Sequence, residues 1–131
     1  MNVMHLNHGQ LKAMIKMGHS IGVHTHTHVS VAASKLNHTE AYKELVWPKI
    51  YLEDQFSCNV FAFSYPFGER QDCLNTSQFL EKTGDYKLAF TIEEIVNNKE
   101  TPPLELGRYM PTSHDTDKSL LQKLNQILGG A

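Results

Sequence analysis

The strongest constraint on the fold of this chain is the alternation of short apolar runs with amphipathic segments of helical period. Four runs are short and apolar enough to be buried strands, namely residues 20–23, 60–65, 86–91 and 104–110. Parallel strands need a crossover connection, usually a helix, that brings the next strand back in the same direction. The sequence therefore predicts an α/β fold with parallel strands.

The segments between these runs carry the start and stop signals of helices. Residues 9–18 place apolar side chains at a near-helical period and end on Gly18, which suits a left-handed helix end. Asn37, with Glu40 three positions later, predicts a capped helix start. Pro48 predicts a kink or a division into two pieces, because proline lacks a backbone donor. Two further helices are expected at residues 76–83 and from 115 or 116 to 128.

The composition is that of an ordinary globular domain. Apolar residues make up 40% and charged residues 20% of 131 residues, so we expect one domain that covers residues 1–131. A net charge of -2 offers no basic surface for phosphates, which argues against nucleic acid as a partner. No apolar run approaches the about 20 residues that span a bilayer, and residues 1–10 lack the order of a signal peptide. Cys58 and Cys73 have no metal or redox spacing and are expected to be core or loop thiols.

Three alternating histidines, His24, His26 and His28, follow the run at 20–23. In parallel α/β folds, functional groups gather at the carboxyl ends of strands. If the chain turns helical from Thr25, His24 and His28 share one face with Cβ atoms about 5–6 Å apart, which suits chelation of one metal ion. His26 should then point away, toward solvent or into packing. The alternative is that all three are surface histidines at a helix start.

Longer motifs place these histidines in a family context. Residues 18–28, Gly-His-Ser-Ile-Gly-Val-His-Thr-His-Thr-His, resemble the second motif of polysaccharide deacetylases, a His-Ser/Thr-x-x-His signature after a Gly-His-x-Ile-Gly strand. Residues 63–68, Phe-Ser-Tyr-Pro-Phe-Gly, resemble the Tyr-Pro-Tyr/Phe-Gly form of the third motif. Residues 86–91 and 106–109 resemble a later strand and a Leu-x-Arg element. The chain thus looks like a polysaccharide deacetylase domain of the NodB-homology type from about residue 11 to near the C-terminus.

This resemblance implies a fold, an activity and a cofactor. The fold would be a partial (β/α) barrel, and the activity would be metal-dependent hydrolysis of the N-acetyl groups of a glycan. His24 and His28 would bind a divalent metal ion, with zinc as the first candidate. Members of the family often work at the cell envelope or are secreted, and the sequence itself does not indicate where this chain is located.

The resemblance also assigns roles to residues on later strands. Tyr65, Pro66 and Phe67 would form the wall of a substrate groove, with the Phe67 N–H facing the developing oxyanion. Arg108 would orient the catalytic carboxylate through a charge-assisted hydrogen bond. The residues alone leave two alternatives open, because the three groove residues could pack a strand end and Arg108 could be a solvated strand residue.

The chain departs from the family at the first motif, Thr-Phe-Asp-Asp-Gly, which supplies the general base and the third metal ligand. The sequence has no Asp-Asp pair, and no acidic residue precedes His24. Ser64 stands where the third motif often has arginine, and the setting of His114 does not fit the late catalytic histidine. We therefore expect the N-terminal strands of the barrel, and the third protein ligand, to be missing.

These departures lead to expectations about activity and assembly. Loss of a general base typically costs roughly 10²–10⁴ in rate, so the chain alone should be nearly inactive. The gap should leave an open sheet edge that favours self-association, unless a fuller protein supplies the strand. The alternative function is a non-catalytic descendant that binds carbohydrate or metal, and a purely structural domain is the third hypothesis.

Overall fold

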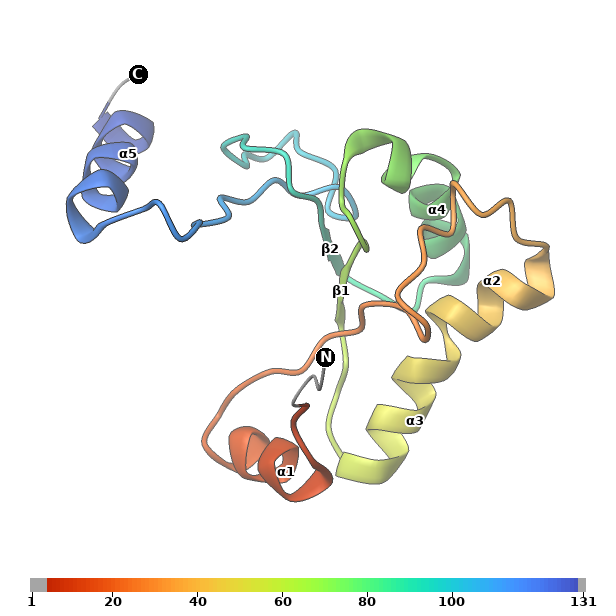
Figure 1. The fold of residues 1–131 in the computed structure, drawn as a ribbon. Coiled ribbons are helices and arrows are strands. Elements are labelled where there is room, and N and C mark those ends of the chain that lie inside the picture. The colour runs from red at the N-terminus through yellow and green to blue at the C-terminus, as the bar shows by residue number, and fades with distance from the viewer. Residues whose placement is uncertain (1–4, 130–131) are drawn as a thin grey trace.

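The computed structural model describes residues 5–129 and contains five helices and two strands within that range. In chain order the elements are α1 (His8–Lys16), α2 (His38–Leu45), α3 (Trp47–Phe56), β1 (Ala62–Ser64), α4 (Arg70–Thr83), β2 (Leu88–Phe90) and α5 (Asp117–Gly129) (Figure 1). None of the helices in this part of the chain has the length and apolar character needed to cross a membrane.

The strands lie side by side and run in the same direction. β1 pairs with β2 in parallel, with Phe63 opposite Ala89. Val23 forms a parallel bridge to Phe63 on one side, and Leu106 forms one to Phe90 on the other side. All four predicted strand runs therefore contribute to one parallel arrangement, which confirms the predicted α/β class. The two outer runs form single bridges rather than full strands, so the predicted strand lengths were too long.

The predicted helix start at Asn37 and the predicted division near Pro48 are both present in the structure. The Asn37 side chain accepts from the N–H of Glu40, and the Glu40 carboxylate accepts from the N–H of Asn37, each within 3.0 Å. Pro48 lies in the first turn of α3, and the helical segment divides at Val46 into α2 and α3. A proline is tolerated in a first turn because its missing N–H would have no intrahelical partner there.

Helix α4 begins earlier than predicted. It starts at Arg70 rather than at Thr76. The Asp72 carboxylate accepts from the N–H of Glu69 at 3.1 Å and satisfies one of the donors at the helix start. The kink at Leu74, with φ −26° and ψ −105°, divides this polar first part from the apolar part that the periodicity detected.

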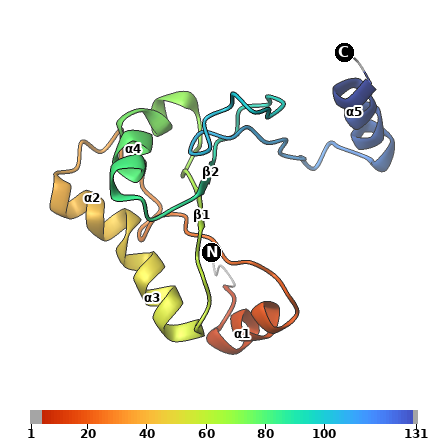
Figure 2. The same ribbon diagram turned by 180° about the vertical axis from the view of Figure 1, so that it is seen from behind.

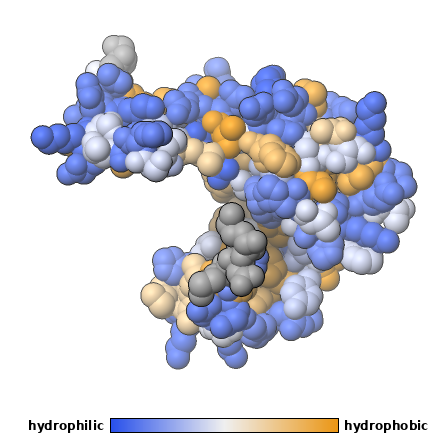
Figure 3. Space-filling model, in the orientation of Figure 1, coloured by the Kyte–Doolittle hydropathy of each residue, from blue (hydrophilic) through white to orange (hydrophobic). Residues whose placement is uncertain are grey.

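The core lies between the strands and helices α2, α3 and α4, which stand to one side of the strands in both views (Figures 1 and 2). Phe63, Tyr65, Leu45, Leu80 and Val60 are among its largest fully buried side chains. Helices α1, α3 and α5 contribute no fully buried residue, although Leu52 of α3 is partly buried against the core. The space-filling view shows an open concavity between α1 and the segment that leads to α5 (Figure 3). Among residues 5–129, the helices that pack on the strands therefore stand on one side of them.

Candidate functional site

The histidine pair lies where two neighbouring strand runs end. His24 directly follows Val23, which bridges to Phe63 of β1. The His24 Nδ1 atom lies 2.7 Å from the main-chain carbonyl oxygen of Ser64, the last residue of β1. This contact holds the His24 ring against the adjacent strand, at the end of the sheet where parallel folds carry their sites.

His24 and His28 come together, but not on a helix. Their ring centroids are 4.8 Å apart at an interplanar angle of 69°. The intervening segment is a loop in which Thr25 and His28 take left-handed backbone angles, with φ of 60° and 58°. The expected helical turn from Thr25 is therefore wrong, although the pairing that it was meant to produce is present. Two left-handed residues reverse the chain and bring the second imidazole back to the first.

The contact of His24 with Ser64 determines which ring nitrogen is available. A carbonyl oxygen can only accept, so Nδ1 of His24 carries the hydrogen in this contact. In a neutral imidazole the other nitrogen, Nε2, then has its lone pair free. Hydrogen bonds of this kind commonly orient histidines that ligate metal ions. Both histidines are exposed, so the pair is open to a ligand from solvent.

The loop that carries the histidines is attached to helix α2. The Glu44 carboxylate accepts from the N–H of Thr27 at 2.9 Å and from the Thr27 hydroxyl at 2.6 Å. The main-chain carbonyl of Glu44 accepts from the N–H of His26 at 3.0 Å. Neither Glu44 nor Thr27 stood out in the sequence, because no local pattern indicates that the end of α2 meets this loop.

The described residues supply two candidate ligands at this site. Within residues 5–129, no group of three or more His, Cys, Asp or Glu side chains is placed to hold a metal ion. His26 is exposed and lines a separate hollow with Trp47, Pro48 and Tyr51 of α3. It therefore points away from the pair, as expected. His114 lies far along the chain, in an exposed turn ahead of α5.

The three predicted groove residues differ in what they expose. Phe67 is 61% exposed, and its ring centroid lies 5.3 Å from that of His28. Pro66 is buried. Tyr65 is only 1% exposed, and its hydroxyl donates to the carbonyl of Leu104 at 2.6 Å. Phe67 therefore presents a side chain beside the histidines, whereas the side chain of Tyr65 belongs to the core.

The main-chain N–H of Phe67 has no hydrogen-bond partner among the described residues. Phe67 takes a left-handed φ of 65°. Left-handed angles in residues other than glycine carry a cost and gather at functional sites. Thr25, His28 and Phe67 make three of the five such residues in the described part of the chain, and all three lie at or next to this site.

Arg108 is placed at a different hollow. Its main-chain N–H donates to the carbonyl of Glu93 at 2.9 Å, and its Nε atom is buried without a partner among the described residues. The side chain lines a cavity of about 390 Å³ that also involves Tyr109 and Lys123. The structure does not bring Arg108 into contact with the histidine pair. Ser64, at the position of the family's arginine, likewise has a buried hydroxyl without a partner in this part of the chain.

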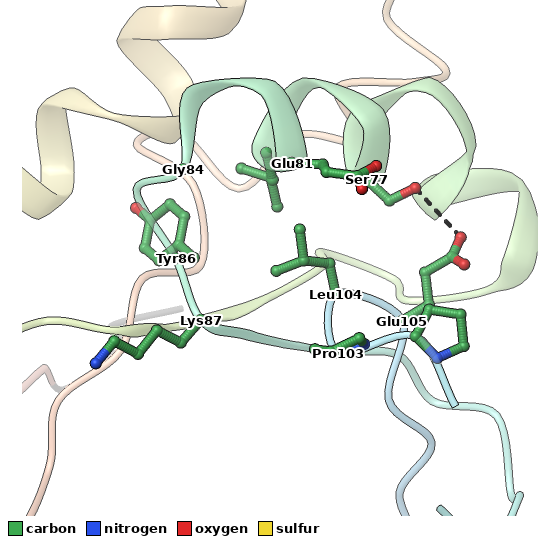
Figure 4. A pocket seen from close by; sticks show the side chains of 10 residues that line it. Ser77, Glu81, Gly84, Tyr86, Lys87, Pro103, Leu104 and Glu105 are labelled. Atoms are coloured by element: carbon green, nitrogen blue, oxygen red, sulfur yellow. Dashed lines mark hydrogen bonds between the residues drawn. The ribbon is translucent and has the colours of Figure 1, made fainter. Parts of the chain in front are cut away.

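Another hollow, separate from those beside His26 and Arg108, lies at the amino end of β2. It has a volume of about 340 Å³ and is lined by the end of α4 and the Pro102 to Glu105 turn (Figure 4). The Ser77 hydroxyl donates to the Glu105 carboxylate across it at 3.2 Å. Amino ends of parallel strands mainly serve stability, and the polar side chains of Ser77 and Glu105 in this hollow are already paired with each other.

Comparisons with known proteins agree on one family. Residues 3–86 match the family model described as polysaccharide deacetylase. No curated protein matches the chain. The chain is similar to the deacetylase PplD of Streptococcus pyogenes, solved in complex with acetate, with a TM-score of 0.77 and 26% identity. That match covers 89% of this chain and 50% of the other.

A second solved structure extends the comparison of folds. BC0361, a polysaccharide deacetylase from Bacillus cereus, matches with a TM-score of 0.72 and 24% identity, which shows the fold alone. The match covers 91% of this chain and 36% of that one. The chain therefore spans half or less of the length of these two relatives.

Proposed function

Because this chain belongs to the polysaccharide deacetylase family, we propose that it takes part in the metal-dependent hydrolysis of N-acetyl groups on a glycan. The observation that carries the proposal is the pairing of His24 with His28, 4.8 Å apart between ring centroids, with Nδ1 of His24 bonded to Ser64. The acetate bound to PplD is consistent with this chemistry in a relative. In this proposal residues 1–131 form a single domain.

The residues fit a divalent metal ion as two of its ligands. Imidazole nitrogen suits zinc and the neighbouring first-row ions, and the free Nε2 of His24 is the kind of donor that they bind. When bound, such an ion supplies Lewis acidity for the N-acetyl carbonyl and for water. A catalytic zinc site has three protein ligands, so the pair alone does not complete one.

The remaining residues of the site would hold the substrate. The exposed ring of Phe67 offers an apolar wall beside His28, and its N–H points to no acceptor within the described residues. Such an N–H can donate to an oxygen that becomes negatively charged during amide hydrolysis. Pro66, which is buried, would help to fix the turn that carries Phe67. Arg108 would contribute only by orienting the catalytic carboxylate, and within the described residues it forms no ion pair with a carboxylate.

The third ligand and the general base would come from a strand that pairs beside Val23. Within residues 5–129, Val23 forms its bridge to β1 and no other strand pairs with its outer edge. An unpaired edge presents N–H and C=O groups that favour addition of a strand. In this proposal, that strand belongs to the intact protein or to a second copy, and the chain alone has impaired activity.

One observation favours a second candidate function. Because the described residues contribute two histidines and no third ligand, the chain could bind a metal ion or a carbohydrate without hydrolysing it. This binding-only function predicts association with an N-acetylated glycan and no release of acetate from it. Measurement of both quantities on one preparation distinguishes the two functions.

The test is calorimetric titration with zinc and with cobalt. We expect binding by the unsubstituted chain, loss of binding in the His24→Ala, His28→Ala double variant, and retention of binding in His26→Ala. The last variant removes a histidine from the same loop that lines another hollow. Absence of zinc and cobalt binding by the folded, unsubstituted chain would refute the metal site.

Acetate release from chitotetraose, measured with and without zinc, then tests hydrolysis. Release that depends on zinc and disappears in the double variant supports the deacetylase function. Binding of chitotetraose without release supports the binding-only function.

A further inference from the structure

We propose that Glu44 of helix α2 is a positioning residue that holds His24 and His28 in their paired geometry. The proposal rests on the proposed function only for its consequence in metal binding, because the geometric role of Glu44 is independent of any ligand. The carboxylate does not touch the imidazoles, and it acts through Thr27, which lies between them in the loop.

The contacts of Glu44 account for the central part of the loop. Its two carboxylate oxygens accept separately from the N–H and the hydroxyl of Thr27, at 2.9 and 2.6 Å. Its main-chain carbonyl accepts from the N–H of His26. One residue of α2 therefore satisfies three donors on two successive loop residues. A carboxylate acceptor also makes these hydrogen bonds stronger than neutral ones.

The loop needs such an attachment because its backbone is costly. Thr25 and His28, on either side of Thr27, have φ of 60° and 58°. Residues other than glycine in this region are strained and persist only where the surroundings enforce them. Within the loop, only the bond from the Val29 N–H to the Thr25 hydroxyl, at 3.2 Å, opposes relaxation. From outside the loop, the Glu44 contacts hold its middle, His26 and Thr27, while the Ser64 carbonyl holds the His24 ring at its start.

The place of Glu44 in its helix supports a role beyond helix stability. Glu44 is the second-last residue of α2, which ends at Leu45. An anion in the last turn is disfavoured, because the carbonyl ends of the helix carry partial negative charge. A residue that breaks a local preference is expected where it serves a site. Here the carboxylate is turned to the histidine loop instead of being paired along its helix.

The test uses Glu44→Ala, the conservative Glu44→Gln, and Glu81→Ala as the matched control. Glu81 is an exposed helical glutamate at a different hollow. A glutamine can still accept from the Thr27 N–H and donate to its hydroxyl, so it should preserve the loop. The first measurement is the nuclear Overhauser effect between the His24 and His28 rings in metal-free protein. We expect the effect in the unsubstituted chain, Glu44→Gln and Glu81→Ala, and its loss in Glu44→Ala.

The second measurement is the zinc dissociation constant from calorimetry. Loss of a group that hydrogen-bonds to a metal ligand typically weakens binding about 10–100-fold. Glu44 acts one residue further out, so we expect a loss at the lower end, about 10-fold, for Glu44→Ala alone. A contact between the rings that persists in folded Glu44→Ala would overturn the proposal. A merely structural role would lower the unfolding midpoint and leave the ring contact intact below it, which also counts against the proposal.

Two further outcomes keep the proposal separate from the proposed function. If the unsubstituted chain shows the ring contact but binds no zinc, the proposed metal function fails. The positioning role of Glu44 is then decided by whether Glu44→Ala loses the contact between the two rings. If Glu44→Ala does not fold, Thr27→Val removes only the hydroxyl donor from this exposed residue. That variant should weaken the ring contact, and an unchanged contact in it would overturn the proposal.

Discussion

The Nδ1 atom of His24 lies 2.7 Å from the carbonyl oxygen of Ser64, so the side chain of one strand end is oriented by the main chain of the next. A main-chain acceptor keeps its place whatever the side chain at that position. Ser64 can therefore replace the arginine common in the family's third motif without disturbing the orientation of His24. The contact also leads directly to a prediction about the proton on that ring.

In metal-free protein at about neutral pH, neutral His24 should be the Nδ1–H tautomer, because the Ser64 carbonyl can only accept. Long-range ¹H–¹⁵N correlation spectra distinguish the two tautomers of a histidine. His26 makes no side-chain hydrogen bond within the described residues and should follow the Nε2–H preference of a free imidazole. A predominantly Nε2–H tautomer at His24 would mean that the contact with Ser64 does not form in solution.

A second prediction concerns acid stability and Glu53 of α3. Its carboxylate accepts from the Val60 N–H at 3.0 Å and from the Lys49 ammonium at 2.9 Å. The Val60 hydrogen bond, followed by that of Lys49, lowers the pKa of Glu53 below its ordinary value of 4.5. A lowered pKa stabilises the fold above 4.5, and this stability is lost as the pH falls through the folded-state value. The thermal unfolding midpoint should therefore decrease as the pH is lowered from neutral to below 4.5.

The matched comparison uses Glu53→Gln and Glu81→Gln. The first should be less stable at neutral pH and should lose less stability on acidification, since the titrating group is gone. The second, at an exposed helical position, should follow the unsubstituted chain. Thermal unfolding followed by circular dichroism across this pH range measures the difference. Identical pH profiles for the unsubstituted chain and Glu53→Gln would contradict the role of Glu53.

Local sequence signals predicted the parts of the fold that depend on nearby residues. The capping pair of Asn37 and Glu40 and the division of the helical segment before Pro48 are both determined within one turn. The start of α4 was missed, because its first turn is polar and its apolar period begins only beyond the kink at Leu74. Periodicity detects the buried face of a helix and not a solvated first turn.

The site was harder to predict, because tertiary contacts determine it. The helical spacing of His24 and His28 suggested the correct pair for the wrong reason, since two left-handed residues bring the rings together. The attachment of Thr27 to Glu44 joins residues 17 positions apart and has no sequence signature. Arg108 was assigned by resemblance, and within the described residues its side chain forms no ion pair with a carboxylate.

A third prediction separates the two thiols. Cys73 is 2% exposed, and burial raises the pKa of its thiol to about 12. Cys58 is partly exposed. Because the thiolate is the reactive form, a disulfide reagent at about pH 8 should modify Cys58 in the folded protein and Cys73 only after unfolding. Cys58→Ser should abolish the reaction of the folded protein, and rapid modification of that variant would show that Cys73 is accessible.

The last prediction concerns Gly107, which precedes Arg108. A Cβ atom there would lie 2.2 Å from a side-chain carbon of Ile95 and 2.7 Å from the main-chain oxygens of Glu93 and Ile95. The main chain of Gly107 is also held from both sides, because its N–H and carbonyl pair with the Asn97 side-chain amide at 2.9 Å. The Ile95 side chain could rotate away, but the two main-chain oxygens could not, so part of the crowding cannot be relieved by a rotamer change.

Gly107→Ala should lower the free energy of unfolding by about 1–3 kcal/mol, the usual cost of overpacking. Gly9→Ala is the matched control, since its Cβ would meet only the Asn7 side chain, at 3.4 Å. Alanine favours the helix over glycine by up to about 1 kcal/mol, so that variant should be neutral or more stable. If the main chain of the 93–97 loop packs against Gly107, urea unfolding should give a lower free energy of unfolding for Gly107→Ala. The value for Gly9→Ala should be equal to that of the unsubstituted chain or higher. Equal stability of Gly107→Ala and the unsubstituted chain would show that this loop moves away and that the hollow beside Arg108 is adaptable.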